Sequence, residues 1–136
     1  MRHTHIVTLG LAVALGLVAR RAEPVPAPQG PFGPISLEVT PARYTGRCPV
    51  RLRFTGTIAV STHPMAFNYQ FERSDGAKSQ VRVVRVPNNG PATYRVNEQW
   101  QLGAAGQHMQ VWEKLKVASG VTRVETNPMS VDITCR

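Results

Sequence analysis

Apolar and polar residues alternate in seven segments of the chain after residue 34. The segments cover residues 35–39, 50–60, 67–71, 81–86, 94–102, 109–117 and 129–133. They are rich in β-branched and aromatic residues, and no segment after residue 22 has the 3.6-residue period of an amphipathic helix. A period of two with this composition is typical of strands that bury one face. The pattern therefore predicts seven short β-strands.

Turn-forming residues separate the strands, as in Ser74-Asp-Gly76 and Pro87-Asn-Asn-Gly-Pro91. Seven strands in about 100 residues, each with one apolar face, predict an all-β sandwich of two antiparallel sheets. The alternation slips by one residue between Val83 and Val84, which predicts a β-bulge there. A chain of 136 residues has room for one core of ordinary size, so we expect a single domain at residues 35–136.

The first 22 residues have the pattern of a secretory signal peptide. Arg2 and the α-amino group precede an apolar run at residues 6–19, which would span about 21 Å as a helix. This is short of the ~30 Å hydrocarbon core of a membrane, although an uncleaved, tilted anchor is the alternative. Three of the 16 basic residues, Arg2, Arg20 and Arg21, lie in this segment. Its removal lowers the formal net charge from +8 to +5.

Residues 23–34 form a proline-rich linker, EPVPAPQGPFGP. Proline fixes φ and removes a backbone donor, so the composition favours an extended polyproline II spacer.

The two cysteines lie at the two ends of the expected domain. Cys48 directly precedes the second predicted strand, and Cys135 directly follows the seventh. If each connection reverses the chain, the second strand starts where the seventh finishes. An eighth strand at residues 121–124 would instead place the cysteines at opposite ends. An exported chain meets an oxidising compartment, so we expect a Cys48–Cys135 disulfide; two free thiols or a metal-binding pair are the alternatives.

Five short motifs are spread over residues 36–135. They are Val39-Thr-Pro with Tyr44-Thr-Gly-Arg-Cys-Pro-Val50, Phe54-Thr-Gly-Thr-Ile58, Tyr69-x-Phe71-x-Arg73-Ser-Asp-Gly76, Trp100-x-Leu102-Gly-Ala104 and Val131-x-Ile133-x-Cys135. Together they resemble the immunoglobulin-like domains of small secreted bacterial proteins, a largely uncharacterised family. The resemblance implies the fold and export and implies little about function. Phe71 stands where antibody domains have Trp, so antibody-like recognition is not implied.

Basic residues at outward-facing strand positions form a candidate face for an anionic ligand. They are Arg51, Arg53, Arg82, Arg85, Arg95, Lys114 and Lys116, with Trp112 at the same parity as the two lysines. An aromatic ring among cations can stack on a base or a sugar. The second and sixth strands of a sandwich normally belong to opposite sheets, which would divide this charge. The alternative is an ordinary solvated face that discourages edge pairing.

Imidazole and thioether groups provide a weaker copper hypothesis at His63, Met65 and His108. Met109 has core parity and so points away from His108. The sequence contains no Gly-x-Ser-x-Gly, His-Glu-x-x-His or phosphate-binding glycine loop. We therefore expect no enzymatic activity, no catalytic residues and no cofactor.

Glu98 and Glu113 fall at apolar positions of the alternation. Either each lies beyond the edge of the core or one is buried against an arginine, because a lone buried carboxylate is costly.

These observations favour a secreted, non-enzymatic binding module that presents loops and a polar face to an extracellular protein or surface polymer. The alternatives are a basic module that binds acidic polysaccharide, extracellular DNA or lipid headgroups, and a copper-binding periplasmic protein. We expect no stable membrane insertion after signal cleavage, and nucleic acid is not a favoured partner.

Overall fold

The computed structural model of the chain describes residues 30–136, which form nine β-strands and no helix. The signal peptide expected at 1–22 and residues 23–29 of the expected linker lie outside the described residues. Among residues 30–136 there is no helix of the length and hydropathy that would cross a membrane. In chain order the strands are β1 (Phe32–Thr40), β2 (Arg43–Gly46), β3 (Val50–Val60), β4 (Met65–Arg73), β5 (Arg82–Val86), β6 (Thr93–Leu102), β7 (His108–Ser119), β8 (Thr122–Glu125) and β9 (Met129–Cys135).

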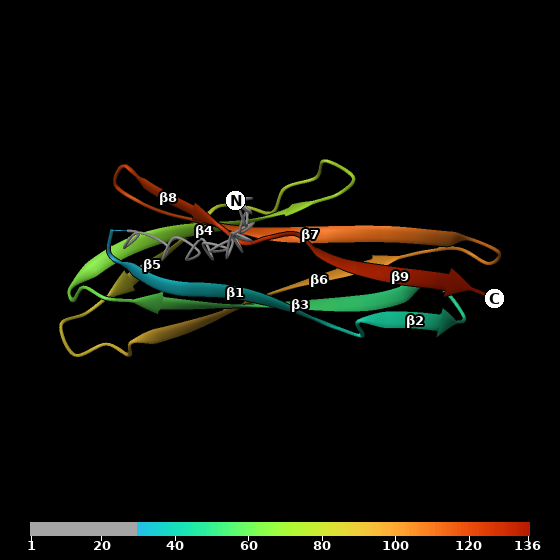
Figure 1. Cartoon of the computed structure of the whole chain (residues 1–136), viewed down its shortest axis with the longest axis horizontal. Helices are drawn as coiled ribbons and strands as arrows, with labels where there is room; N and C mark the ends of the chain where they lie inside the picture. The colour runs from blue at the N-terminus through green and yellow to red at the C-terminus, as the bar shows by residue number, and fades with distance from the viewer. Residues whose placement is uncertain (1–29) are drawn as a thin grey trace, which may run out of the picture.

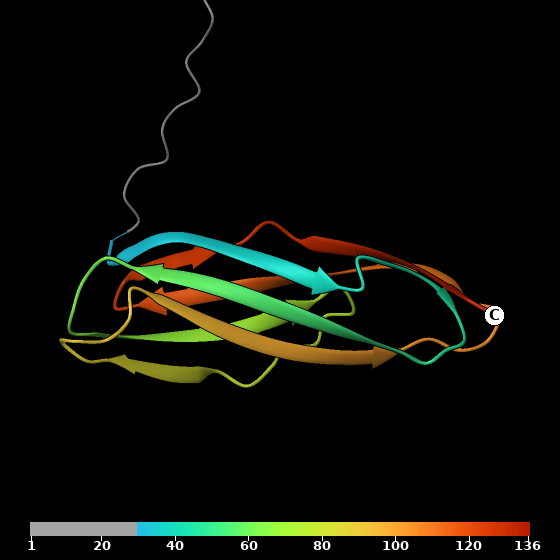
Figure 2. The same ribbon diagram turned by 90° about the horizontal axis from the view of Figure 1, so that it is seen from below.

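The strands form two sheets that face each other (Figure 1). One sheet has three strands in the order β1-β3-β6, which lie side by side in Figure 2. The other has six strands, in the order β2-β9-β7-β4-β5 with β8 also paired to β7. The all-β, two-sheet arrangement that the alternation predicts is therefore confirmed.

The prediction of seven antiparallel strands is wrong in two places. The additional strands β2 and β8 have four residues each, too few to show a clear alternation. Strand β2 also runs parallel to β9, so the second sheet is mixed.

Strand β8 does not separate the cysteines, contrary to expectation. Strands β8 and β9 lie one after the other along the same edge of β7, and both are antiparallel to it: Lys116 pairs with Glu125, and Trp112 pairs with Ser130. Residues 126–128 therefore interrupt the strand pairing, and the chain continues in the same direction from β8 into β9. Cys135 arrives at the end of the sandwich where Cys48 lies, and the expected Cys48–Cys135 disulfide is present, with a Cα–Cα distance of 5.4 Å.

The first strand begins before the expected domain boundary at residue 35. Phe32 is buried and pairs with Val60, so residues 32–34 of the expected linker belong to β1. The register shifts between Phe32 and Ile35, where Gly33 and Pro34 intervene. Pro34 has no N–H to donate to the ladder, which explains why the irregularity falls there.

The bulge expected between Val83 and Val84 is absent. Strand β5 pairs with β4 without a break, from Tyr69 opposite Arg82 to Met65 opposite Val86. The slip in the alternation arises because Val83 points outward and is 65% exposed, whereas Val86 points into the core.

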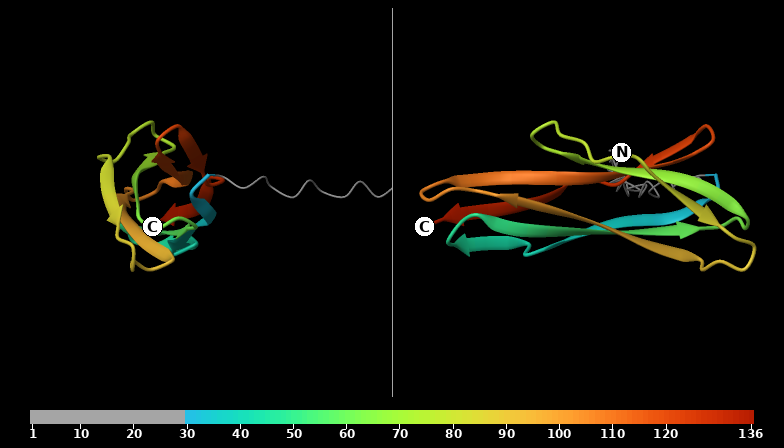
Figure 3. Two further views of the ribbon diagram at one scale, coloured as in Figure 1. Left: turned by 90° about the vertical axis from the view of Figure 1, so that its left-hand side faces the viewer. Right: turned by 180° about the vertical axis from the view of Figure 1, so that it is seen from behind.

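The core lies between the two layers, which enclose it in the view along the strands (Figure 3, left). Its most deeply buried large side chains come from both sheets and include Phe54, Ile58, Phe67, Phe71 and Leu115. The inward residues are those that the alternation selects, which confirms the predicted period of two.

Gly56 leaves room for a side chain of the facing sheet. It lies on β3 at a buried position, and a Cβ atom there would be 2.5 Å from Leu115 Cδ2 and 3.0 Å from Val96 Cγ2. Leu115 is fully buried on β7 in the facing sheet.

We expect Gly56→Ala to destabilise the domain by about 1–3 kcal/mol, the usual cost of adding a methyl group to a full core. Urea unfolding measures the change. Leu115→Val removes the Cδ2 methyl group against which the new Cβ would press, so the double variant should lose less stability than the two single variants together. A Gly56→Ala protein as stable as the wild type would contradict this account of the packing.

Candidate functional site

The basic residues predicted to form an anionic-ligand face lie on both outer faces of the sandwich. Arg51, Arg53 and Arg95 alternate with the inward residues of β3 and β6 and lie on the outer face of the three-stranded sheet. Trp112, Lys114 and Lys116 lie on the outer face of the six-stranded sheet. Arg82 and Arg85 are three residues apart on β5 and therefore point to opposite faces of that sheet. The structure does not bring these residues into one patch.

The two lysines of the predicted face are engaged with carboxylates. Lys114 Nζ lies 3.5 Å from Glu125 Oε1, and Lys116 forms an ion pair with Glu72. The hydrogen bond between the latter two lowers the pKa of Glu72 and raises the pKa of Lys116. Lys114 also lies 6.0 Å from the centre of the Trp112 ring. The positive charges of Lys114 and Lys116 are therefore largely compensated by carboxylates of the same sheet.

The residues of the copper hypothesis lie far apart. His63 and Met65 are at the end of the sandwich where β3 leads into β4, and His63 Nε2 is 3.0 Å from the carbonyl oxygen of Pro91. His108 begins β7 at the opposite end, where it pairs with Thr134 beside the disulfide. Met109 packs against the core, as its parity predicts. Residues 30–136 contain no group of three or more His, Cys, Asp or Glu side chains that could hold a metal ion.

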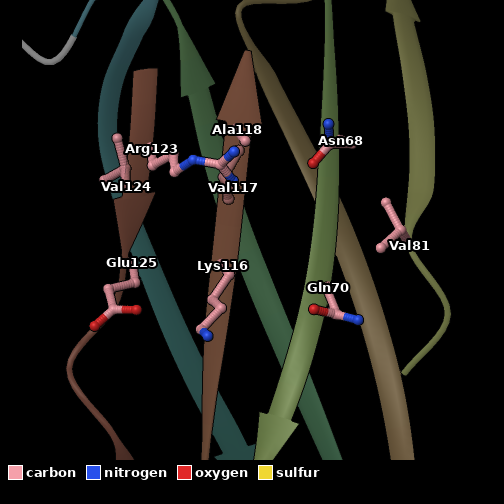
Figure 4. A pocket seen from close by; sticks show the side chains of 9 residues that line it. All are labelled: Asn68, Gln70, Val81, Lys116, Val117, Ala118, Arg123, Val124 and Glu125. Atoms are coloured by element: carbon pink, nitrogen blue, oxygen red, sulfur yellow. The ribbon is translucent and has the colours of Figure 1, made fainter. Parts of the chain in front are cut away.

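A hollow of about 380 Å³ lies on the outer face of the six-stranded sheet, over β4, β7 and β8 (Figure 4). We call it the trough. Its lining residues are Asn68, Gln70, Val81, Lys116, Val117, Ala118, Arg123, Val124 and Glu125.

The strand register explains why these residues meet. Ala118 on β7 pairs with Arg123 on one side and with Asn68 on the other, and Asn68 pairs in turn with Val83. These four residues form one row across the sheet. The adjacent row contains Glu125, Lys116 and Gln70 in the same strand order. Ala118 has the smallest side chain of the two rows, and in Figure 4 the Arg123 guanidinium extends toward β7 beside it.

Two raised segments flank the trough. Figure 1 shows the β7–β8 hairpin and the β4–β5 connection rising from the same face of the six-stranded sheet. The connection is fixed by hydrogen bonds: Arg73 donates to both Asp75 carboxylate oxygens, and Gln70 Nε2 donates to the Ser79 carbonyl at 2.9 Å. The Ala77 N–H also donates to Asp75, which lowers the pKa of this carboxyl group.

Among the polar groups of the trough, some have partners and some are free. Lys116 and Glu125 belong to the ion pairs described above. Arg123 forms no ion pair with any residue that the structure describes, and the Asn68 side chain makes no hydrogen bond within residues 30–136. The trough thus offers one free guanidinium and one free carboxamide to a ligand.

Exposed apolar residues gather around this trough. Within the described part of the chain, the exposed large hydrophobic residues are Val81, Val83 and Val121, with exposed fractions of 57%, 65% and 100%. Val81 lines the trough, Val83 ends its first row, and Val121 lies at the tip of the flanking hairpin. An apolar cluster on one face of a protein is typical of an interaction surface.

The alternation along the chain does not single out Arg123, Asn68 or Gln70 as site residues. Asn68 and Arg123 are 55 positions apart, and only the pairing of β4, β7 and β8 places them in one row. The one sign of this surface in the sequence is the slip in the alternation at Val83 and Val84. A period of two cannot place both valines in the core, so one of them must face solvent.

Glu113 is buried between the sheets, near the partly buried Glu98. Glu113 on β7 is fully buried, and neither of its carboxyl oxygens accepts a hydrogen bond from a described residue. Burial raises the pKa of Glu113 to about 9, and the negative charge of the neighbouring Glu98 adds to the shift. Arg73, its cross-strand neighbour, opposes this shift, and Asp75 adds to it. Of the two expected arrangements, burial of one glutamate beside an arginine is therefore the one observed.

Comparisons of the chain with family models, curated proteins and solved structures gave no significant match. The interpretation of the trough therefore depends on its geometry.

The raised pKa of Glu113 makes the stability of the domain depend on pH. The folded state retains a proton that the unfolded chain releases near the ordinary pKa of 4.5, so this group stabilises the fold most below that pH. The stabilisation should fall as the pH rises toward about 9. Glu113→Gln, which keeps the shape and cannot ionise, should remove this slope and make the protein more stable than the wild type at pH 8.

Urea unfolding between pH 5 and pH 8.5 measures this dependence, and Glu125→Gln is the matched control because Glu125 is exposed. If wild type and Glu113→Gln show parallel pH profiles, Glu113 is ionised in the folded protein and the assignment of the proton is wrong.

Proposed function

We propose that the protein is an exported, non-enzymatic binding module with an immunoglobulin-like fold, and that the trough is its binding surface. The observation on which this depends is that the exposed Val81 lines the trough, and that the exposed Val83 on β5 pairs with its lining residue Asn68. Such a face combines an apolar contact area with a few polar groups that orient a partner, which is the usual composition of a recognition surface.

The strand order supports the immunoglobulin-like part of the proposal. The N-terminal part of the domain contributes to both sheets: β1 pairs antiparallel with β3 in one, and β2 pairs parallel with β9 in the other. The motifs between residues 36 and 135 resemble the same class of domain.

Export is supported by the disulfide and by the N-terminal sequence. A Cys48–Cys135 bond persists in an oxidising compartment and is rare in the cytosol. The charged and apolar pattern of residues 1–22 is that of a secretory signal.

Site-specific photo-crosslinking tests the position of the binding surface. We expect a benzophenone amino acid at position 83 to crosslink a discrete partner from surface material of the cells that make the protein. The same amino acid at position 57 should not do so, because Thr57 lies on the outer face of the three-stranded sheet. Crosslinks of equal yield from both positions, or from position 57 only, would contradict the proposal.

A second candidate function is binding of an anionic polymer by the three-stranded sheet. Arg51, Arg53 and Arg95 share its outer face, and none of them forms an ion pair with a described residue, whereas Lys114 and Lys116 on the other face do. Unpaired guanidinium groups on the outer face of one sheet suit a polymer of phosphates, sulfates or carboxylates.

The salt dependence of heparin binding tests this second function. Each cation that contacts the polymer adds slightly less than one unit to the slope of log affinity against log salt. Replacing Arg51, Arg53 and Arg95 by Gln should therefore reduce the slope by about 2–3. Replacing Lys114 and Lys116 by Gln is the matched control, and it should leave the slope unchanged. The reverse result would assign the polymer to the six-stranded sheet, and no binding by the wild type would exclude this function.

A further inference from the structure

The chemistry of the trough changes in a fixed order across the strands. The row that crosses its centre begins with the free Arg123 guanidinium on β8, passes the small Ala118 on β7 and the free Asn68 carboxamide on β4, and ends at Val83 on β5. A ligand that fills this row meets a cation at one end, hydrogen-bonding groups in the middle and an aliphatic surface at the other end (Figure 4).

The span of the row matches a short extended peptide. The Arg123 guanidinium lies beside Ala118 on β7, and neighbouring strands lie about 4.8 Å apart, so two spacings from β7 to β5 cover about 10 Å. An extended chain rises about 3.3–3.6 Å per residue, so about three residues cover this distance.

The polar groups in the middle suit a peptide backbone. Asn68 can both donate and accept, and Gln70 Nε2 is already held by Ser79, which leaves its oxygen as an acceptor. Amide groups that repeat along a ligand can pair with both side chains. The apolar contact at the far end is offered by valines and suits an aliphatic side chain.

An anionic group of the ligand would bind at Arg123, because the other cation of the trough is already paired. Lys116 is paired with Glu72, and Glu125 is paired with Lys114. Arg123 is the cation of the trough without such a partner among residues 30–136, and a guanidinium can bind a carboxylate through two parallel hydrogen bonds.

We propose that the trough binds an extended segment of a partner protein, laid across β8, β7, β4 and β5, with an Asp or Glu side chain at Arg123 and an aliphatic side chain against Val81 and Val83. This inference rests on the proposed function, because it specifies the chemistry of the partner at the same surface.

A random heptapeptide library displayed at the N-terminus of a phage coat protein tests the proposal, because its peptides have no free C-terminal carboxylate. The full chain is expressed, and phages that bind the purified protein are selected. Phages that also bind the Ala118→Leu variant, in which the larger side chain fills the trough, are then removed. We expect the remaining peptides to share an acidic and an aliphatic residue about three positions apart.

Affinities of a synthetic, C-terminally amidated consensus peptide then locate the contacts. Arg123→Gln should weaken binding at least 10-fold, Arg123→Lys should retain part of the affinity, and Arg95→Gln on the other sheet should have no effect. Thermal unfolding of each variant shows whether it is folded. Arg123 is exposed, so its variants remain informative if Ala118→Leu fails to fold.

Three results would overturn the inference: enriched peptides without an acidic residue, peptides that bind Arg123→Gln as well as the wild type, or no enrichment at all. If position 83 still crosslinks a partner in any of these cases, the proposed function stands and only the peptide chemistry is wrong. If position 83 also gives no crosslink, both are wrong.

Discussion

Close contact between the two sheets is the constraint on which the rest of the structure depends. Leu115 on β7 packs where β3 has no side chain at Gly56, and the core is filled from both layers. A strand that shifted by one residue would move its whole apolar set to the solvent side. The packing therefore fixes which side of each strand faces inward, and the outward side follows. Figure 3 (right) shows how β7 runs along nearly the whole length of this contact.

The trough is a consequence of that same choice. Because Leu115 and Val117 are buried, Lys116 and Ala118 must point outward. Pairing with β4 and β8 then adds Asn68 and Arg123 to the row of Ala118. The order of these side chains across the trough is set by the pairing register of β4, β7 and β8. The same register sets the inward residues of these strands, so a shift of register would change the trough and the core together.

The sequence alone predicts the parts of this structure that depend on periodicity. Alternation identifies the long strands and their inward residues, and the positions of Cys48 and Cys135 predict the disulfide. Strands β2 and β8 were missed because four residues show hardly one period, and because pairing to β9 and β7 stabilises them more than their own pattern does. The trough was missed for a related reason. Its rows join residues from separate strands, and no local pattern specifies which residue of β8 lies opposite Ala118.

The buried Glu113 shows that the interior and the trough are connected through Arg73. This residue lies opposite Glu113 on the neighbouring strand, and its guanidinium is 4.5 Å from the centre of the Trp100 ring in the facing sheet. The same guanidinium binds Asp75, whose carboxylate accepts the Ala77 N–H in the segment that flanks the trough. An ionised Glu113 would compete with Asp75 for this guanidinium, because both carboxylates lie close to it. The raised pKa keeps Glu113 neutral, which leaves Arg73 to Asp75 and so supports the contact between Asp75 and the Ala77 N–H in the flanking segment.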